Sequence, residues 1–285
     1  MFPAERTVDL WHGVVAGFDG TDRARCAVRW AAAEAAVRGC PLHVVRVVEP
    51  VPPTVATGWV PPGLSGPSED QRCLIEDEVV AEIDACRAAT PGLEAHGAIH
   101  DGRPHSRLAE HANLVGANVV AVGVSDLGAV SRLLLGSTGA ELIRTTRRVV
   151  VAVRDLTPVQ QAAVVTGYAP VVAMVDDRAT SARVLAFACD MAHRWGTSVT
   201  VVHAGRVVPA AVRGWLTDAR SRYPGVRVDV AAAGTQPHLA ALDLSADAPL
   251  VAVGDRRHGV LRRLLTGSAA HTLLHHAKCS VAVVP

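Results

Sequence analysis

The sequence predicts an α/β protein built from two tandem domains, each a doubly wound parallel sheet. Its 285 residues leave room for two hydrophobic cores, since a domain averages about 150 residues. The chain also carries an internal repeat, and each half alternates Val- and Ala-rich runs with helical segments, as in a parallel sheet covered on both faces. We expect domain 1 at 1–157 and domain 2 at 163–285, with Pro158 and Gly167 as breakers in the joining segment.

Two offsets align the halves of the chain with each other. An offset of 157 residues places Asp19 on Asp176 and aligns the first third of each half. An offset of 131 residues places VVAVG, ending at Gly123, on LVAVG, ending at Gly254, and aligns the last thirds. The offsets differ by 26 residues, and much of this excess is the Pro- and Gly-rich stretch 50–70, which is predicted to be a long loop.

The expected elements occur in the same order in both halves. A strand, a helix and a strand open each half, a helix, a strand and a helix follow, and a strand, a helix and a final strand close it. The expected bounds are 14–18, 23–38, 42–48, 119–122 and 148–153 in domain 1, and 171–175, 180–195, 199–204, 250–253 and 280–284 in domain 2.

Composition argues against several classes of partner and site. Hydrophobic residues make up 49% of the chain and the formal net charge is +1, so no strong field attracts nucleic acid or an anionic membrane. No apolar run reaches the roughly 20 residues of a membrane span, and the first residues lack the apolar stretch of a signal peptide. The six cysteines form no C-x-x-C pair, which favours a reducing cytoplasm. Lys278 is the only lysine, which excludes a Walker A loop.

The residues after the first strand of domain 1 are one candidate ligand site. In open parallel sheets, ligands bind outside the carboxyl ends of the strands, where the strand order reverses. There, the Asp19 carboxylate could accept hydrogen bonds from a base or ribose, and Gly20 lets a ligand approach the backbone. The alternative is that Asp19 or Thr21 only caps the helix that follows.

The loop after the fourth strand of domain 1 is the second candidate. It runs from Gly123 to Thr138 and ends at the start of a helix, whose free N–H groups attract anions. The alternative is a capping box formed by Thr138 and Glu141, which would satisfy those N–H groups without a ligand.

Together these residues resemble the universal stress protein family, over nearly the whole chain and in both halves. ATP-binding members of that family carry a glycine, two residues, a glycine, nine residues, a glycine and then Ser or Thr. Both halves keep the outer spacing, with Gly123, Gly136 and Ser137 in the first and Gly254, Gly267 and Ser268 in the second. The opening segment VVAGFDGT and the closing segment HAKCSV are also similar to those of the family.

The resemblance implies a fold of the adenine nucleotide alpha hydrolase-like superfamily, with ATP as the ligand and Mg²⁺ as a companion ion. The residues it assigns to the nucleotide are Gly17, Asp19, Gly20, Thr21, Val47, Gly123, Asp126, Gly136, Ser137, Thr138, Asp176, Gly254, Arg257, Gly267 and Ser268.

Both halves depart from the family's motif at its middle glycine, where Asp126 and Arg257 stand. A carboxylate about 6 Å from a phosphate costs about 2–3 kcal/mol at an effective dielectric near 20, which rivals the roughly 0.3–2 kcal/mol that a helix terminus contributes. Unless Mg²⁺ bridges the two groups, Asp126 is therefore expected to weaken ATP binding.

Domain 2 departs further, in the part of the site that would hold the base. Met174 replaces the glycine that matches Gly17, and Arg178 stands where domain 1 has Thr21. The basic residues 256–258 of its loop, in contrast, suit an anion. Domain 1 is therefore expected to keep the base and ribose half of a site, and domain 2 a cationic phosphate half.

A metal site and a catalytic site are weaker alternatives. His271, His275 and Cys279 follow one another at intervals of four, so the histidines could share a helix face and chelate a metal, but the place of Cys279 before the last strand favours a structural role. No G-x-S-x-G elbow or G-x-G-x-x-G motif points to a hydrolase or an NAD enzyme. We expect no enzymatic activity, with a slow ATPase or nucleotide transferase as the alternative.

The sequence thus leaves two main functions open. The first is a cytoplasmic regulatory protein of the stress response that binds ATP, chiefly in domain 1, and changes its contacts with a partner. The second is a nucleotide-independent dimeric scaffold with degenerate sites. In either case the short apolar final strands are expected to pair the two domains with each other, or with those of a second chain in a homodimer.

Overall fold

The structure is a computed structural model that describes residues 13–49, 68–124, 137–157, 160, 167–205, 208–234, 236–255 and 269–285. Contacts divide the chain into two compact units. Unit 1 comprises Met1–Val122 with Arg144–Arg148, and unit 2 comprises Gly123–Ile143 with Val149–Pro285. The final strand of the first repeat is therefore grouped with the second repeat.

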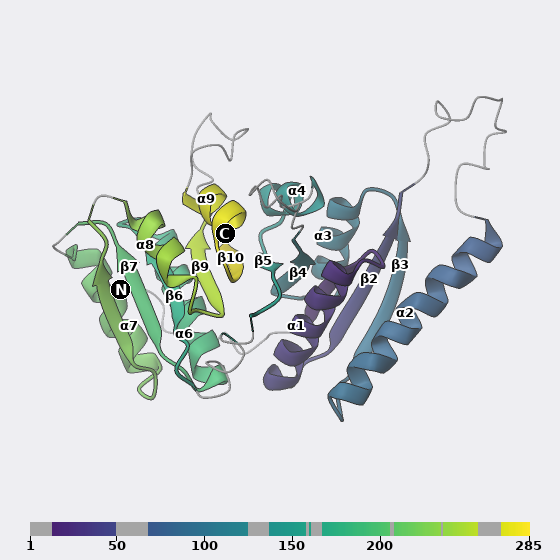
Figure 1. Cartoon of the computed structure of the whole chain (residues 1–285), viewed down its shortest axis with the longest axis horizontal. Helices are drawn as coiled ribbons and strands as arrows, with labels where there is room; N and C mark the ends of the chain where they lie inside the picture. The colour runs from purple at the N-terminus through teal and green to yellow at the C-terminus, as the bar shows by residue number, and fades with distance from the viewer. Residues whose placement is uncertain are drawn as a thin grey trace. The chain divides into compact units, whose positions relative to one another are not determined.

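Unit 1 is a parallel sheet in the order β3-β2-β1-β4 (Figure 1). Its strands are short and rich in Val and Ala, and the three helices connect them in βαβ units. The elements are β1 (Val14–Phe18), α1 (Asp22–Arg38), β2 (Leu42–Val48), α2 (Glu69–Ala89), β3 (Ala95–Asp101), α3 (Pro104–Leu114) and β4 (Val119–Gly123).

Two glycines identify the helices that cover each face of this sheet. A Cβ added to Gly97 of β3 would lie 2.8 Å from Val79 of α2, whereas one added to Gly17 of β1 would lie 3.2 Å from Leu108 of α3. Gly97 pairs with Val44 of β2, and Gly17 pairs with Val45. Successive residues of a strand point to opposite faces of the sheet, so Gly97 and Gly17 also face opposite sides. The unit is therefore doubly wound, with α2 on one face and α3 on the other.

Unit 2 repeats this arrangement and adds two strands, β10, which is parallel to β9, and β5, which is antiparallel to β10 (Figure 1). Its strand order is β5-β10-β9-β6-β7-β8, and all neighbours are parallel except β5 and β10. The elements after Gly123 are α4 (Ser137–Thr145), β5 (Val149–Val153), β6 (Val171–Val175), α6 (Thr180–Trp195), β7 (Val199–His203), α7 (Ala210–Arg222), β8 (Val228–Ala232), α8 (Pro237–Leu244), β9 (Leu250–Gly254), α9 (Ala269–His276) and β10 (Ser280–Val284).

The closing strands of the two repeats pair with each other, as expected from the sequence. Val281 of β10 lies opposite Ala152 of β5, and Val283 lies opposite Val150, in an antiparallel ladder. Both strands are buried, so each covers an apolar edge of the other.

The expected element bounds agree with the structure to within one residue, but the end of the long loop was predicted wrongly. Residues 50–67 lie outside the described part of the chain, and α2 already begins at Glu69. Ser68 and Gln71 form a capping box there, with hydrogen bonds of 3.0 and 3.3 Å. Because α2 has 21 residues and α7 has 13, the longer helix takes eight of the 26 extra residues.

The core of each unit is aliphatic, as the composition predicts. Val14, Leu42 and Val119 in unit 1, and Val171 and Leu250 in unit 2, are completely buried. Within the described ranges, no helix is both long and apolar enough to cross a membrane.

Candidate functional site

The carboxyl ends of β1 and β4 form the switch point of the sheet in unit 1. β2 and β3 lie on one side of β1, and β4 lies on the other. β1 and β4 are parallel, with Val14 beside Val119 and Ala16 beside Ala121, so the chain leaves both strands at the same edge. Ligands of doubly wound sheets bind at such a point, and here Asp19 is the first residue after β1.

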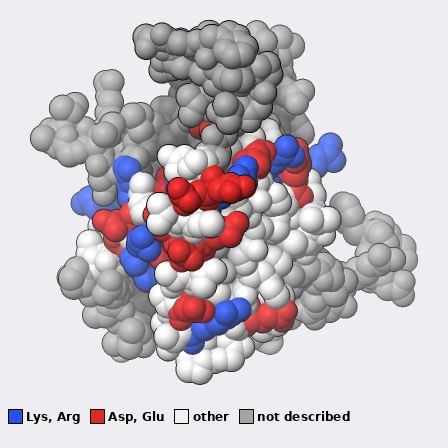
Figure 2. Space-filling model, turned by 90° about the vertical axis from the view of Figure 1, so that its right-hand side faces the viewer, with Lys and Arg blue, Asp and Glu red and all other residues white. Residues whose placement is uncertain are grey.

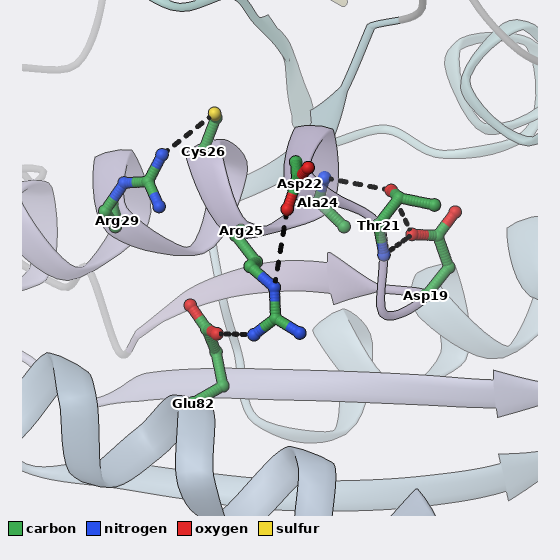
Figure 3. Close-up of polar contacts among 8 residues, drawn as sticks. All are labelled: Asp19, Thr21, Asp22, Ala24, Arg25, Cys26, Arg29 and Glu82. Atoms are coloured by element: carbon green, nitrogen blue, oxygen red, sulfur yellow. Dashed lines mark hydrogen bonds and ion pairs between the residues drawn. The ribbon is translucent and has the colours of Figure 1, made fainter.

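The turn after β1 is closed by hydrogen bonds around Asp19 and Thr21 (Figure 3). Oδ1 of Asp19 accepts from the backbone N–H of Thr21 at 3.0 Å and from its hydroxyl group. Oγ1 of Thr21 accepts from the N–H of Ala24 at 3.3 Å, which makes Thr21 the N-cap of α1. The capping interpretation is therefore confirmed for Thr21. The Asp19 side chain is exposed, and Oδ2 accepts no hydrogen bond from the residues that the structure describes, so it is available to a ligand.

The structure explains why glycine stands at positions 20 and 17 near this turn. Gly20 has φ +82°, and a Cβ there would lie 3.1 Å from Nη1 of Arg46 and 3.2 Å from Oε2 of Glu78. Gly17 leaves room for Leu108 of α3, as described above. Gly20 thus keeps the backbone open at the carboxyl edge, whereas Gly17 serves the packing of α3.

A partly buried ion pair between α1 and α2 lies near this turn (Figure 3). Nη1 of Arg25 in α1 lies 2.6 Å from Oε2 of Glu82 in α2, whose side chain is only 7% exposed. The Arg25 guanidinium also lies 5.4 Å from the centre of the Phe18 ring, a cation–π distance. Because Arg25 is in the first turn of α1, these contacts fix the start of that helix, and with it the Asp19 turn.

Sequence reasoning missed Arg46, which lies on β2 beside Gly20. Its guanidinium is 5.9 Å from the Phe18 ring centre, and Nη1 is buried without a hydrogen-bond partner among the described residues. A buried unpaired N–H donor is costly, so this group would gain from an acceptor. The signal in the sequence was a single arginine in the otherwise largely apolar strand LHVVRVV.

The structure describes four more of the assigned residues in this repeat. Val47 of β2 is half-buried and lies opposite His100 of β3. Gly123 is the last residue of β4, and α4 begins at Ser137. Thr138 lies inside the first turn of α4 and not at its cap, so the predicted capping box with Glu141 was wrong.

Five assigned residues lie outside the described part of the chain. They are Asp126, Gly136, Arg257, Gly267 and Ser268.

In unit 2, the aspartate that matches Asp19 is engaged by its own chain. Oδ1 of Asp176 accepts from the Ser181 hydroxyl at 2.8 Å and from the Arg178 N–H at 3.0 Å. Oδ2 lies 3.8 Å from Nε of Arg178. Both carboxylate oxygens therefore face donors of the protein, and Ala179, at the cap position of α6, makes no side-chain hydrogen bond.

The strand end beside Asp176 is also filled. Met174 is 8% exposed, where unit 1 has Gly17. A Cβ added to Gly254 at the end of β9 would lie 3.0 Å from Thr180. Unit 2 thus places a methionine side chain at the position where unit 1 has Gly17.

The alternative metal site receives no third ligand from Cys279. The His271 and His275 rings lie 4.1 Å apart on α9, but Cys279 is completely buried, and burial raises the pKa of its thiol to about 12. Over the described ranges, no group of three or more His, Cys, Asp or Glu side chains is arranged to hold a metal ion.

Comparison with known proteins agrees with this architecture. The family model described as "Universal stress protein family" matches residues 11–154 and 210–285. Universal stress protein Rv2005c of Mycobacterium tuberculosis is 30% identical over 300 residues, which cover 95% of this chain and 96% of that protein. A universal stress protein of Mycolicibacterium smegmatis is 28% identical over 297 residues, covering 96% of this chain and 97% of that protein.

A solved structure shows the same fold over the full tandem arrangement. The crystal structure of a universal stress protein from Archaeoglobus fulgidus aligns with a TM-score of 0.75 and 16% identity, and it covers 96% of this chain and 98% of that one. With the two matched segments and the repeated doubly wound sheet, the chain belongs to the universal stress protein family as a tandem two-domain member.

Proposed function

We propose that the chain is a regulatory protein of the stress response that binds ATP at the carboxyl edge of β1 in its first repeat. The observation that carries the proposal is the Asp19 turn. It leaves one carboxylate oxygen exposed at the switch point of the sheet, whereas Asp176 in the second repeat is engaged by Ser181 and Arg178. A ribose hydroxyl or an adenine amino group would donate to such an oxygen.

The motif spacing supports the phosphate side of this proposal. In the first repeat, Gly123, Gly136, Ser137 and Thr138 have the family's spacing, and α4 begins at Ser137. A helix amino terminus attracts phosphate through its free N–H groups and dipole. Asp126 opposes this attraction, so Mg²⁺ would serve as the bridge between its carboxylate and the phosphates.

Calorimetric titration of the full chain with Mg-ATP, together with mass spectrometry of nucleotide retained through purification, tests the proposal. We expect saturable binding near one site per chain and no ADP formation, as for a regulatory protein that binds ATP without hydrolysing it. No heat at millimolar ATP, with no retained nucleotide, would overturn it. ADP formation that is lost on substitution of Ser137 would instead support the enzymatic alternative.

A nucleotide-independent scaffold is the second candidate, and the β5–β10 pairing favours it. That ladder joins the closing strands of the two repeats within one chain and needs no ligand. Asp126 and Arg257 in place of the family's glycine favour it as well. Retention of the same oligomeric state and partner contacts in a chain that binds no nucleotide would support this function.

The acidic surface of α2 indicates which class of partner this side of unit 1 can bind (Figure 2). Asp and Glu side chains gather on the side of unit 1 that this view presents, and α2 itself carries seven acidic and two basic residues. Such a face repels the phosphate backbone of nucleic acid, which supports the expectation that nucleic acid is not the partner. We further propose that the protein acts in the cytoplasm and forms a homodimer. We propose domain bounds of 1–157 and 163–285.

A further inference from the structure

Four histidines of unit 1 form a cluster on the sheet face that α3 covers. His43 lies on β2, His96 and His100 lie on β3, and His111 lies on α3. The His43 ring centre is 5.3 Å from that of His96 and 5.4 Å from that of His111, and the His100 and His111 centres are 5.1 Å apart. His43 pairs with His96 in register, and His100 follows His96 by four residues, so all three strand positions point to the same face.

The hydrogen bond between His100 and His111 fixes how the buried ring holds its proton. Nε2 of His100 lies 3.0 Å from Nδ1 of His111, and Nε2 of His111 is buried without a hydrogen-bond partner. If Nδ1 of His111 donates, its Nε2 carries only a lone pair. The opposite tautomer would bury an N–H donor with no acceptor, which costs more. Neutral His111 therefore donates to His100, and a second proton would have to go to the buried Nε2.

The surroundings of His111 and His43 disfavour a positive charge on these two rings. His111 is 8% exposed, and burial, with His43 and His100 beside it, lowers its pKa to about 4. Burial and His96 likewise lower the pKa of His43, while Glu94 acts in the opposite direction and lies 2.9 Å from Nε2 of His96.

The other charged groups on these elements either point away from the cluster or form ion pairs. Arg46 of β2 is three positions from His43, so its side chain points to the opposite face of the sheet. On α3, Arg107 pairs with Glu110 at 2.7 Å, and at the end of β3, Asp101 pairs with Arg72 at 2.7 Å. β1, which also packs against α3, has the sequence VVAGF and contributes no ionisable side chain, and neither does β4 with VVAVG. The remaining histidine of α3, His105, makes no ring contact with the cluster among the described contacts.

We propose that this histidine cluster is a proton-operated switch that loosens α3 from the sheet of unit 1 when the medium becomes acidic. In the packed state burial holds the His111 ring neutral, whereas a loosened α3 exposes His111 to water, where it takes up a proton at its ordinary pKa of about 6.5. Since the packed pKa of His111 is the lower one, packing is stable above about pH 6.5 and is weakened progressively as the pH falls toward 4. Leu108 of α3, which faces Gly17, would withdraw from β1 in the loosened state.

Hydrogen exchange of the full chain without nucleotide tests the switch independently of the proposed ATP binding. The peptide covering α3 is compared at pH 7.5 and pH 5.0, after correction for intrinsic exchange rates. We expect its protection to fall roughly 10- to 30-fold, the range set by moving one pKa between about 4 and 6.5. The matching helix α8 is the internal control, because it has Leu244 where α3 has His111, and its protection should stay constant.

Two substitutions on α3 separate the cluster from a general effect of acid. His111→Phe should abolish the loss of protection, and His105→Gln, six residues away on the same helix, should leave it as in the wild type. Unchanged protection of wild-type α3, or a loss that persists in His111→Phe, would overturn the proposal. Should His111→Phe fail to fold, NMR titration of the wild-type rings decides, since a His111 ring that titrates near pH 6.5 in the folded chain contradicts the switch.

Discussion

The turns that follow β1 and β6 occupy the same place in the two repeats, yet they treat the same aspartate differently. Asp19 accepts from Thr21 through one oxygen and leaves the other exposed. Asp176 meets Ser181 and Arg178, with donors facing both oxygens. The repeated fold therefore preserves the position of the carboxylate. The residues that follow it, Thr21 in the first repeat and Arg178 and Ser181 in the second, determine whether one of its oxygens stays available to a ligand.

The first helices of the two repeats, α1 and α6, also differ in the residues that they bury at matching positions. Glu34 and Arg38 of α1 form an ion pair whose side chains are each 1% exposed. The offset of 157 residues places Met191 and Trp195 of α6 at these positions, and Met191 is completely buried. One repeat thus uses a buried charge pair where the other uses apolar packing.

The largest expected effect comes from breaking that buried pair. Glu34→Ala should lower the free energy of unfolding by about 3–5 kcal/mol, because it removes the carboxylate that faces the buried Arg38 guanidinium. Urea unfolding of the full chain measures this. A double change of Glu34→Met with Arg38→Leu, which makes the site apolar as in the second repeat, should recover most of the loss. A Glu34→Ala variant as stable as the wild type would show that water reaches the ion pair.

The next effect concerns the loop of the first repeat. Asp126→Gly restores the family's glycine and removes a carboxylate that costs about 2–3 kcal/mol when it lies near a phosphate. The affinity for ATP without Mg²⁺ should rise at least tenfold in calorimetric titration. Arg257→Gly in the second repeat is the matched control and should not raise it. Equal affinities for wild type and Asp126→Gly would mean that the loop does not meet the phosphates.

A smaller effect is expected at the helix caps. Thr21→Ala removes the side chain that accepts from Ala24 and should cost about 1 kcal/mol of stability. Arg178→Ala, the matched change in the second repeat, should cost less than half as much, because α6 has no side-chain cap. Thermal unfolding of both variants compares them, and equal losses would contradict the assigned difference between the turns.

The smallest effect is chemical and leaves stability unchanged. Burial raises the pKa of Cys86 and Cys189 to about 11 and that of Cys279 to about 12, so these thiols react slowly. Cys73 on α2 is exposed. A thiol reagent at pH 8 should therefore label one cysteine per native chain within minutes, in the first repeat. Rapid labelling in the second repeat would show that its core opens more readily than the structure implies.

The local patterns of the sequence were enough to predict most of the fold. Continuous Val and Ala runs, such as 119–122, mark strands buried on both faces, and the aligned offsets place their counterparts in the second repeat. The start of α2 was missed because Ser68 and Gln71 follow a Pro- and Gly-rich stretch, although their spacing is that of a capping box.

The candidate site was harder to predict, because its character depends on contacts between distant segments. Asp19 was identified from its place after a strand, but its free oxygen depends on the geometry of the turn. Arg46 meets Gly20 only after β1 and β2 pair. The histidine cluster likewise joins residues up to 68 positions apart, from His43 to His111, so no local sequence pattern predicts it.

ATP titration of two matched variants tests the central claim, that the first repeat alone keeps an available carboxylate. Asp19→Asn keeps an acceptor for the Thr21 N–H, so the turn is preserved while the charge is lost, and Asp176→Asn makes the same change in the second repeat. The account predicts that Asp19→Asn weakens Mg-ATP binding at least tenfold and that Asp176→Asn binds as the wild type does. Equal affinities of Asp19→Asn and the wild type, or a loss confined to Asp176→Asn, would contradict it.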